Sequence, residues 1–309
     1  MKELNKVYNG DCLELIKDLD DNSVDVIITD PPYELGSFRG EELKWEAKGN
    51  ALSEIWQECS RVLKEGGLLL SFGANRTIHK IANKIEDAGF EIRDMLIWKY
   101  PQSIPRNMNL SKSIDATLLY GKSSTVYLKK VEQEYGGEEY QISGTNNTMF
   151  GDKVTYNRKV YTPVTDTAKE WEGWGTTLAP SYEPIVMARK KSSENNIANT
   201  VIKNGVGCLN IEKLKEEVGK FPSNVIEVQK EKRDKYNNHP TVKPLKLMEY
   251  LIKMTTKEGQ VVLDPFGGSG STGVAAKRLN RKYIMFELKE NYYNIAEKRL
   301  EEIENVQMS

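Results

Sequence analysis

The sequence predicts an α/β fold, a doubly wound and mostly parallel sheet of seven strands with helices on both faces. Short apolar runs rich in β-branched residues alternate with stretches of helical periodicity from one end of the chain to the other. Glycines end two of the helical stretches, at Gly66 and Gly89, and Pro244 begins another. The composition, 39% hydrophobic and 29% charged, is that of an ordinary globular protein.

The expected strands are short, and most are apolar throughout, as buried parallel strands are. They are Lys6–Gly10, Val24–Thr29, Gly67–Phe72, Ile92–Tyr100, Glu183–Ala188, Gln260–Leu263 and Lys282–Phe286.

The expected helices place apolar residues three and four positions apart, which gives one apolar face to pack on the sheet. They are Cys12–Leu19, Asn50–Leu63, Arg76–Ala88, Pro244–Met254, Ser271–Leu279 and Tyr292–Ile303. Each strand thus has a crossover helix available.

Two polar stretches interrupt this alternation. Pro101–Ala179 is rich in Gly, Asn, Thr and Tyr and shows no clean period, and Lys191–Asn238 is basic and irregular. A loop of such length is uncommon within a compact domain unless it has a function. We interpret both stretches as insertions at the strand-end side of the sheet.

Several classes of protein are disfavoured by the sequence. Cys12, Cys59 and Cys208 have no paired spacing and only two histidines occur, so we expect neither a disulfide framework nor a metal site. No long apolar run or apolar leader is found, and we therefore expect a cytoplasmic protein without a membrane segment.

Charge is distributed unevenly along the chain. Residues 189–246 hold 13 Lys and Arg against 7 Asp and Glu, a net charge of +6, which leaves −7 for the rest of a chain whose total is −1. A basic stretch on an acidic protein is typical of a localised polyanion-binding face, although a solvated lysine-rich surface explains the charge equally well. On the first interpretation, Lys232, Arg233 and Lys235 are candidate contacts to DNA phosphates.

A glycine-rich turn follows the strand that ends at Leu263. The segment Asp264-Pro265-Phe266-Gly267-Gly268-Ser269-Gly270 leads into a helix, and Gly268, Gly270 and Gly273 have the spacing of a nucleotide-binding turn. Glu287 ends the next strand, where a carboxylate could bind ribose hydroxyls. Asp264 before the glycines suits a cofactor that carries an ammonium group and no pyrophosphate.

A rigid loop, Asp30-Pro31-Pro32-Tyr33, follows the strand Val24–Thr29. The two prolines fix φ and remove two N–H donors, so the loop presents acceptors. If the Asp30 carboxylate and the Pro31 carbonyl accept the hydrogens of an exocyclic amine, the lone pair of its nitrogen is aimed at a methyl donor. Tyr33 could stack on the base once the base has left the helix.

Together, and in this order, the two motifs resemble the β class of the S-adenosylmethionine-dependent DNA amino-methyltransferases, in which the catalytic loop precedes the cofactor loop. Four further segments resemble that family in a consistent order. They are Asn9-Gly10-Asp11-Cys12, Arg61-Val62-Leu63-Lys64-Glu65-Gly66-Gly67, Tyr182-Glu183-Pro184-Ile185 and His239-Pro240-Thr241-Val242-Lys243-Pro244.

The resemblance implies a Rossmann-like methyltransferase sheet with permuted motif order, S-adenosylmethionine as cofactor and double-stranded DNA as partner. It implies that Asp11 and Cys12 contact the cofactor's adenine, Glu287 its ribose, and the segment around Asp264 its methionine. The implied cofactor-binding residues are Asp11, Cys12, Asp264, Pro265, Phe266, Gly268, Ser269, Gly270, Thr272, Glu287, His239, Lys243 and Pro244. The implied catalytic residues are Asp30, Pro31, Pro32 and Tyr33.

The expected organisation has two halves of one domain separated by insertions. Residues 1–100 form the catalytic half, 181–190 the last strand of the sheet, and 239–309 the cofactor half. The insertions, 101–180 and 191–238, are where target recognition is expected. Members of the family are often dimers, but the sequence does not decide whether this chain forms a homodimer, nor which DNA sequence it recognises.

Rival interpretations differ in the features they explain. A leading Asp in the tetrapeptide usually accompanies adenine N6 and a leading Ser cytosine N4, so adenine N6 is expected, with cytosine N4 as the alternative. Methyl transfer to RNA or to a protein amide usually goes with Asn at this position. A nicotinamide dehydrogenase explains the glycines alone, and an inactive DNA-binding homologue has no reason to keep both loops.

Overall fold

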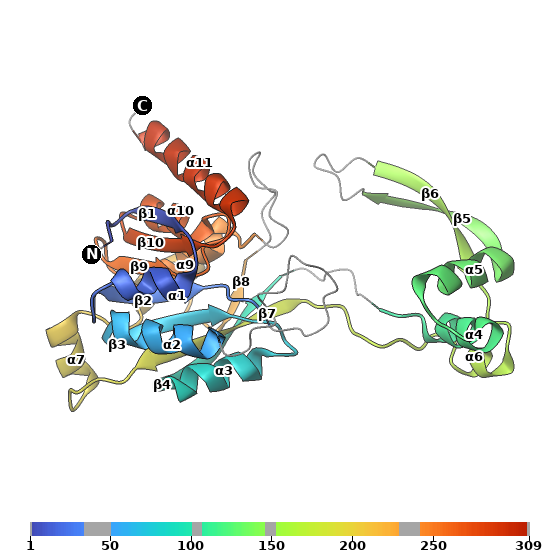
Figure 1. Cartoon of the computed structure of the whole chain (residues 1–309), viewed down its shortest axis with the longest axis horizontal. Helices are drawn as coiled ribbons and strands as arrows, with labels where there is room; N and C mark the ends of the chain where they lie inside the picture. Colours follow the sequence, from blue (N-terminus) through green and yellow to red (C-terminus); the bar gives the residue numbers. More distant parts are fainter. Residues whose placement is uncertain (1, 34–50, 101–106, 146–152, 229–241, 308–309) are drawn as a thin grey trace. The chain divides into compact units, whose positions relative to one another are not determined.

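In the computed structural model, which describes residues 2–33, 51–100, 107–145, 153–228 and 242–307, the chain divides into two compact units. Residues 1–101 and 181–309 form the first unit, and residues 102–180 form the second. Each unit has its own elements, and the first contains the whole of the large sheet (Figure 1).

The large sheet has eight strands among the described residues, and all of them except β7 run in the same direction. Their order across the sheet is β1 (Lys6–Asn9), β10 (Lys282–Glu287), β9 (Val261–Asp264), β2 (Val24–Thr29), β3 (Leu63–Phe72), β7 (Tyr182–Lys190), β4 (Phe90–Lys99) and β8 (Val225–Glu227). The predicted mostly parallel α/β fold is confirmed.

The prediction of seven strands was one short. β8 pairs in parallel with Ile97, Trp98 and Lys99 of β4 at the edge of the sheet. Its three residues come from the basic insertion, and so short a run carries no period of its own. Only the pairing with β4 makes it a strand.

Helices cover both faces of the sheet, and two clusters of buried side chains fill the space between. Against one face pack a short N-terminal helix α1 (Cys12–Leu15) with a 3₁₀ turn at Ile16–Asp18, α2 (Ala51–Val62) and α3 (Ile78–Asp87). Against the other pack α8 (Ile211–Val218), α9 (Leu245–Thr255), α10 (Ser271–Arg278) and α11 (Glu290–Gln307). All six residues of β2 are buried, so that strand lies in the middle of the core.

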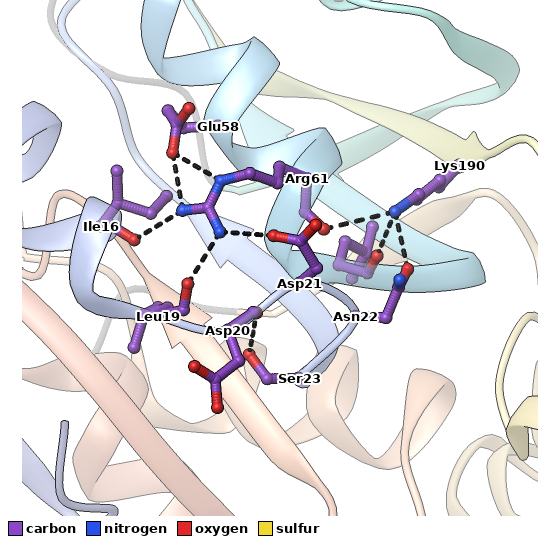
Figure 2. Close-up of polar contacts among 10 residues, drawn as sticks. Ile16, Leu19, Asp20, Asp21, Asn22, Ser23, Glu58, Arg61 and Lys190 are labelled. Carbon is purple, nitrogen blue, oxygen red and sulfur yellow. Dashed lines mark hydrogen bonds and ion pairs between the residues drawn. The ribbon is translucent and has the colours of Figure 1, made fainter. Parts of the chain in front are cut away.

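A network of hydrogen bonds fixes the start of β2 (Figure 2). The Arg61 guanidinium, at the end of α2, donates to the carbonyls of Ile16 and Leu19 and to the carboxylates of Glu58 and Asp21. Lys190, the last residue of β7, donates to the carbonyls of Arg61 and Leu63 and to Asn22 Oδ1. These bonds hold together the turn before β2, the end of α2 and the end of β7.

The first insertion folds as a separate unit, although its sequence shows no clean period from which its elements could be predicted. Its elements are α4 (Leu110–Tyr120), α5 (Thr125–Tyr135), an antiparallel pair of β5 (Gly136–Thr145) and β6 (Lys153–Tyr161), and α6 (Asp166–Glu170). A buried carboxylate, Asp115, accepts hydrogen bonds from the Tyr161 hydroxyl, the Thr165 hydroxyl and two backbone N–H groups. Polar contacts across long sequence separations organise this unit, and they leave no hydrophobic period to detect.

The basic insertion is also more regular than expected. It contains α7 (Ile197–Asn204), α8 and β8, and both helices begin at an Asn whose side chain caps the first turn. Gly205 and Gly219, both with φ near +70°, end the two helices. Among the residues that the structure describes, no helix has the length and apolar content needed to cross a membrane.

Candidate active site

The predicted catalytic loop lies at the carboxyl end of β2, beside the carboxyl end of β9. Pro31 and Pro32 are buried, while Asp30 and Tyr33 are partly exposed. The hydroxyl of Thr77 donates to the Tyr33 carbonyl at 2.7 Å, which ties the end of the loop to the segment before α3. Because parallel strands present their carboxyl ends at one edge, this loop and the glycine turn after β9 meet there.

Four polar side chains gather at this edge: Asp30, Tyr33, Glu183 and Lys243. The Lys243 ammonium lies 2.6 Å from Asp30 Oδ2 and 2.9 Å from Glu183 Oε1, and its side chain is only 8% exposed. The Tyr33 hydroxyl is in hydrogen-bond contact with both carboxylates, and Lys243 Nζ lies 3.1 Å from that hydroxyl. Two carboxylates thus share one ammonium and one hydroxyl.

The charges in this cluster shift the pKa values of its members. Burial by itself would lower the pKa of Lys243, but the negative charges and hydrogen bonds of Asp30 and Glu183 hold it above its ordinary value. Burial raises the pKa of Tyr33 well above that of a free tyrosine, and the negative charges of the same two carboxylates add to this shift. At neutral pH Lys243 is therefore charged and Tyr33 keeps its proton.

The glycine turn has the backbone geometry that its spacing predicts. Gly268 and Gly270 have φ of +52° and +85°, and Gly270 directly precedes α10. A Cβ on Gly273 would lie 2.4 Å from Met285 Cε, so the close approach of helix and sheet here favours glycine, and a larger residue would require Met285 to move. The buried Arg299 of α11 donates to the Ser269 carbonyl at 2.5 Å and supports the turn from behind.

Asp264 links the glycine turn to the catalytic loop. It is 3% exposed, and its Oδ1 accepts from the Thr29 hydroxyl at 2.6 Å and from the Phe266 N–H at 3.1 Å. Its Oδ2 accepts from the Thr272 hydroxyl. Burial raises its pKa to about 6, and these hydrogen bonds oppose the shift. Since Thr29 immediately precedes Asp30, one carboxylate fixes the spacing of the two loops.

Glu287, Asp11 and Cys12 lie at the carboxyl ends of β10 and β1, next to the glycine turn. Glu287 accepts from the N–H groups of Gly268 and Lys289, both at 2.8 Å. The Asp11 side chain caps α1 by accepting from the Leu13 N–H at 2.9 Å. Burial raises the pKa of the half-buried Cys12 thiol to about 12, so the thiol is neutral.

The structure therefore brings most of the predicted site to one edge of one sheet. Pro265, Phe266 and Pro244 also belong to this edge, as neighbours of Asp264 and Lys243. Lys243, expected among the cofactor-binding residues, contacts Asp30 of the predicted catalytic loop directly. His239 and the predicted DNA contacts Lys232, Arg233 and Lys235 lie outside the described residues.

Sequence reasoning assigned no role to four residues that shape this site: Glu183, Thr29, Thr77 and Arg299. A signal existed for Glu183, because this acidic residue begins the expected strand Glu183–Ala188, which is otherwise apolar and directly follows an insertion. Thr29 also ends a buried strand next to the loop. Nothing in the sequence marks Thr77 or Arg299, whose partners are backbone carbonyls distant in the chain.

Two loops of this kind at one sheet edge define a nucleoside-cofactor enzyme with an acceptor-rich catalytic loop. A family model described as "DNA methylase", covering N6 and N4 methyltransferases, matches residues 24–298, nearly the whole chain. The chain belongs to this family of DNA methylases.

Type II methyltransferases match this chain over nearly its full length. The type II methyltransferase M.HindIII of Haemophilus influenzae is 29% identical, over 95% of this chain and 94% of its own. M.HinfI of Haemophilus influenzae and M.BglII of Bacillus subtilis are each 26% identical, over 97% and 96% of this chain and 69% and 68% of their own.

Solved structures share the fold at lower identity. The complex of M1.HpyAVI with SAM has a TM-score of 0.57 at 23% identity, covering 96% of this chain and 98% of its own. The cytosine-N4-specific PvuII DNA methyltransferase has a TM-score of 0.60 at 18% identity, covering 99% of this chain and 92% of its own. The eight-stranded sheet is thus the sheet of DNA methyltransferases.

Proposed function

We propose that this DNA methyltransferase transfers a methyl group from S-adenosylmethionine to N6 of adenine in double-stranded DNA. The observation that carries the proposal is the pairing of two loops at one sheet edge. Asp30 lies on the acceptor-rich loop, and the Asp264–Thr29 hydrogen bond fixes that loop beside the glycine turn. The relatives are type II methyltransferases, which supports a role in a restriction-modification system.

The residues around the glycine turn fit a nucleoside that carries an amino acid. At Gly267 a Cβ would lie 3.1 Å from Met285 Cβ, a tight contact that favours glycine, and a glycine turn before a helix can present backbone N–H groups to a ligand. Glu287 is the candidate partner of the ribose, and Asp11 and Cys12 of the adenine. Bound there, S-adenosylmethionine supplies an electrophilic methyl group.

The proposed chemistry at the amine depends on the acceptors of the catalytic loop. The target amine has two hydrogens, and the Asp30 carboxylate and the Pro31 carbonyl are the acceptors offered by a loop whose prolines donate nothing. Hydrogen bonds to both hydrogens draw the nitrogen lone pair out of conjugation and orient it for attack. As the new N–C bond forms and the bond between the methyl group and sulfur breaks, the nitrogen gives up one proton, and Asp30 is placed to accept it.

Adenine and cytosine both carry such an amine, and the fold serves either base. The leading Asp of the tetrapeptide favours adenine. The PvuII enzyme, named as cytosine-N4-specific, has the same sheet, so cytosine N4 is the alternative. In either case the amine is inaccessible within the duplex, and the base has to turn out of the stack to reach Asp30.

Sequencing that reports modified bases tests this function in one step. DNA from cells that express the protein is compared with DNA from cells that express the Asp30→Ala variant. We expect N6-methyladenine at one recurring sequence in the first sample and none there in the second. N4-methylcytosine at a recurring site would assign cytosine instead, and the absence of any new modified base would refute the proposal.

The basic stretch gives a second prediction, which concerns DNA affinity. If Lys232, Arg233 and Lys235 contact phosphates, replacing all three with Ala weakens binding and reduces the slope of log affinity against log salt by up to about 3, at about 0.9 per contact. Fluorescence anisotropy with a duplex at several salt concentrations measures the slope.

The control for that experiment removes the same charge elsewhere. Lys2, Lys6 and Lys17 each pair with a neighbouring carboxylate at the N-terminal end of the chain. Replacing these three with Ala is expected to leave the slope near that of the unmodified protein. If both triple variants reduced the slope equally, net charge, and not the basic stretch, would set the salt dependence.

A further inference from the structure

The donors of the chain itself engage both carboxylate oxygens of Asp30. Lys243 Nζ lies 2.6 Å from Oδ2, and the Tyr33 hydroxyl contacts Oδ1. Asp30 is also the acceptor that the proposed chemistry assigns to the target amine. An amine that donates to Asp30 must therefore share an oxygen with one of these donors or displace it.

Displacement is costly unless the displaced donor finds another acceptor. Lys243 is almost fully buried, and a buried ammonium without a partner is strongly unfavourable. The described surroundings of Lys243 include one further carboxylate, Glu183, whose Oε1 already lies 2.9 Å from the ammonium. Moving Lys243 entirely to Glu183 keeps its charge paired.

Tyr33, like Lys243, can move from Asp30 to Glu183. Its hydroxyl has one hydrogen but is in contact with two carboxylates, so it can donate to only one of them at a time. Donating to Glu183 leaves Asp30 Oδ1 as well as Oδ2 to the target amine. Glu183 can thus receive both donors that Asp30 releases.

The backbone around the cluster is fixed, so the exchange requires side-chain movement only. Glu183 is paired with Trp98 in the antiparallel ladder of β7 and β4. Thr77 holds the Tyr33 carbonyl, and the buried ring of Phe72 lies 4.8 Å from the Lys243 ammonium. A cationic group over this ring retains a favourable contact while it shifts between the two carboxylates.

We propose that Glu183 is a positioning residue that accepts Lys243 and Tyr33 when the target amine takes their place on Asp30. The inference rests on the proposed function only in requiring an exocyclic amine at Asp30, and cytosine would serve as well as adenine. Methyl transfer itself remains the task of the catalytic loop.

A double-mutant cycle tests the exchange. Glu183→Gln weakens the alternative acceptor, so Lys243 stays on Asp30, and we expect kcat to fall at least tenfold with little change in the KM for S-adenosylmethionine. Lys243→Met leaves two carboxylates without a cation and also lowers kcat. The double variant lacks both the Lys243 ammonium, which competes for Asp30, and the negative charge of Glu183. We therefore expect it to have at least threefold more activity than Glu183→Gln alone.

Activity is measured as tritiated methyl groups incorporated into DNA of mixed sequence, so the result does not depend on which base is modified. If Glu183 and Lys243 only maintained the fold, the double variant would be as impaired as the worse single variant, or more so, and that result would overturn the inference. Glu183→Asp keeps a carboxylate and is expected to retain more activity than Glu183→Gln. Thermal unfolding shows whether each variant is folded.

Two further variants separate possible failures. Glu194→Gln removes a carboxylate outside the cluster, which lies 2.7 Å from the Lys203 ammonium. This variant should behave like the unmodified protein. Asp30→Ala tests the proposed chemistry itself. An active Asp30→Ala enzyme would contradict the proposed function, whereas an inactive one together with a fully active Glu183→Gln enzyme would contradict only the role of Glu183.

Discussion

A partly buried lysine, Lys190, lies at the start of β2 and a buried one, Lys243, at its carboxyl end, and the two have different partners. At the start of the strand, Lys190 donates to two backbone carbonyls and to Asn22 (Figure 2). At the carboxyl end, Lys243 donates to two side-chain carboxylates, those of Asp30 and Glu183. Carbonyl acceptors move only with the main chain, whereas carboxylates on side chains can exchange partners. The same strand is fixed at one end and adjustable at the other.

The pKa values reflect this difference. Burial lowers the pKa of Lys190, because its nearest acceptors are neutral and the carboxylates of Glu65 and Asp21 only partly compensate. The pKa of Lys243 is raised in spite of its burial, because two carboxylates contact it. A charged cluster with exchangeable partners is suited to chemistry, whereas a lysine that donates to neutral acceptors is suited to holding the strand.

The largest expected effect comes from breaking the adjustable end. Asp30→Ala removes the acceptor that the proposed mechanism assigns to the target amine, and we expect methyl transfer to fall by about 10³-fold, the upper part of the range for loss of one preorganised hydrogen-bonding group. Binding of S-adenosylmethionine, measured by calorimetry, should persist, because the glycine turn is unchanged. Near-normal turnover in this variant would contradict the role assigned to Asp30.

The matched control breaks the fixed end. Lys190→Met removes a donor from the Leu63 carbonyl and one of the two donors to the Arg61 carbonyl, and it should lower the free energy of unfolding by about 1–2 kcal/mol. The methylation rate per folded molecule should stay unchanged. If Lys190→Met impaired methylation as severely as Asp30→Ala, the two ends of β2 would not have separate tasks.

A pH-dependent effect is expected at Asp264, which joins the adjustable end to the glycine turn. Its pKa is raised from 3.8 to about 6, so its protonated form is favoured in the folded chain. Its contribution to stability is therefore fully present below the unfolded pKa and is lost as the pH rises through about 6. At about 1.36 kcal/mol per pKa unit, the loss between pH 4 and pH 7 amounts to at most about 3 kcal/mol.

Asp264→Asn removes this titration. Urea unfolding at pH 4 and at pH 7 should show the variant gaining stability relative to the unmodified protein as the pH rises. A constant difference between the two proteins over this range would mean that Asp264 is not the titrating group. The same variant tests cofactor binding. If the Asp264 carboxylate contacts the cofactor's ammonium, Asp264→Asn should weaken the affinity for the cofactor. If the carboxylate only joins Thr29 to Thr272, the affinity should stay unchanged.

Much of the fold and of the site follows from local sequence patterns. The seven expected strands are all present, because buried parallel strands are recognisable as short apolar runs. The predicted catalytic loop and the glycine turn each consist of consecutive residues, so both motifs can be recognised in the sequence without a structure. The helices of the first insertion were missed, because the contacts of Asp115 with Tyr161 and Thr165 join residues about fifty positions apart.

The sequence by itself determined the family of this protein, its two loops and the amine chemistry that an acceptor-rich loop implies. Only the tertiary structure decided that Lys243 and Glu183 share Asp30, and that the Asp264 carboxylate is already bound by Thr29 and Thr272. The physical reason is distance along the chain. Glu183 lies 150 residues from Tyr33, and only the pairing of strands at one sheet edge brings such groups within hydrogen-bonding range.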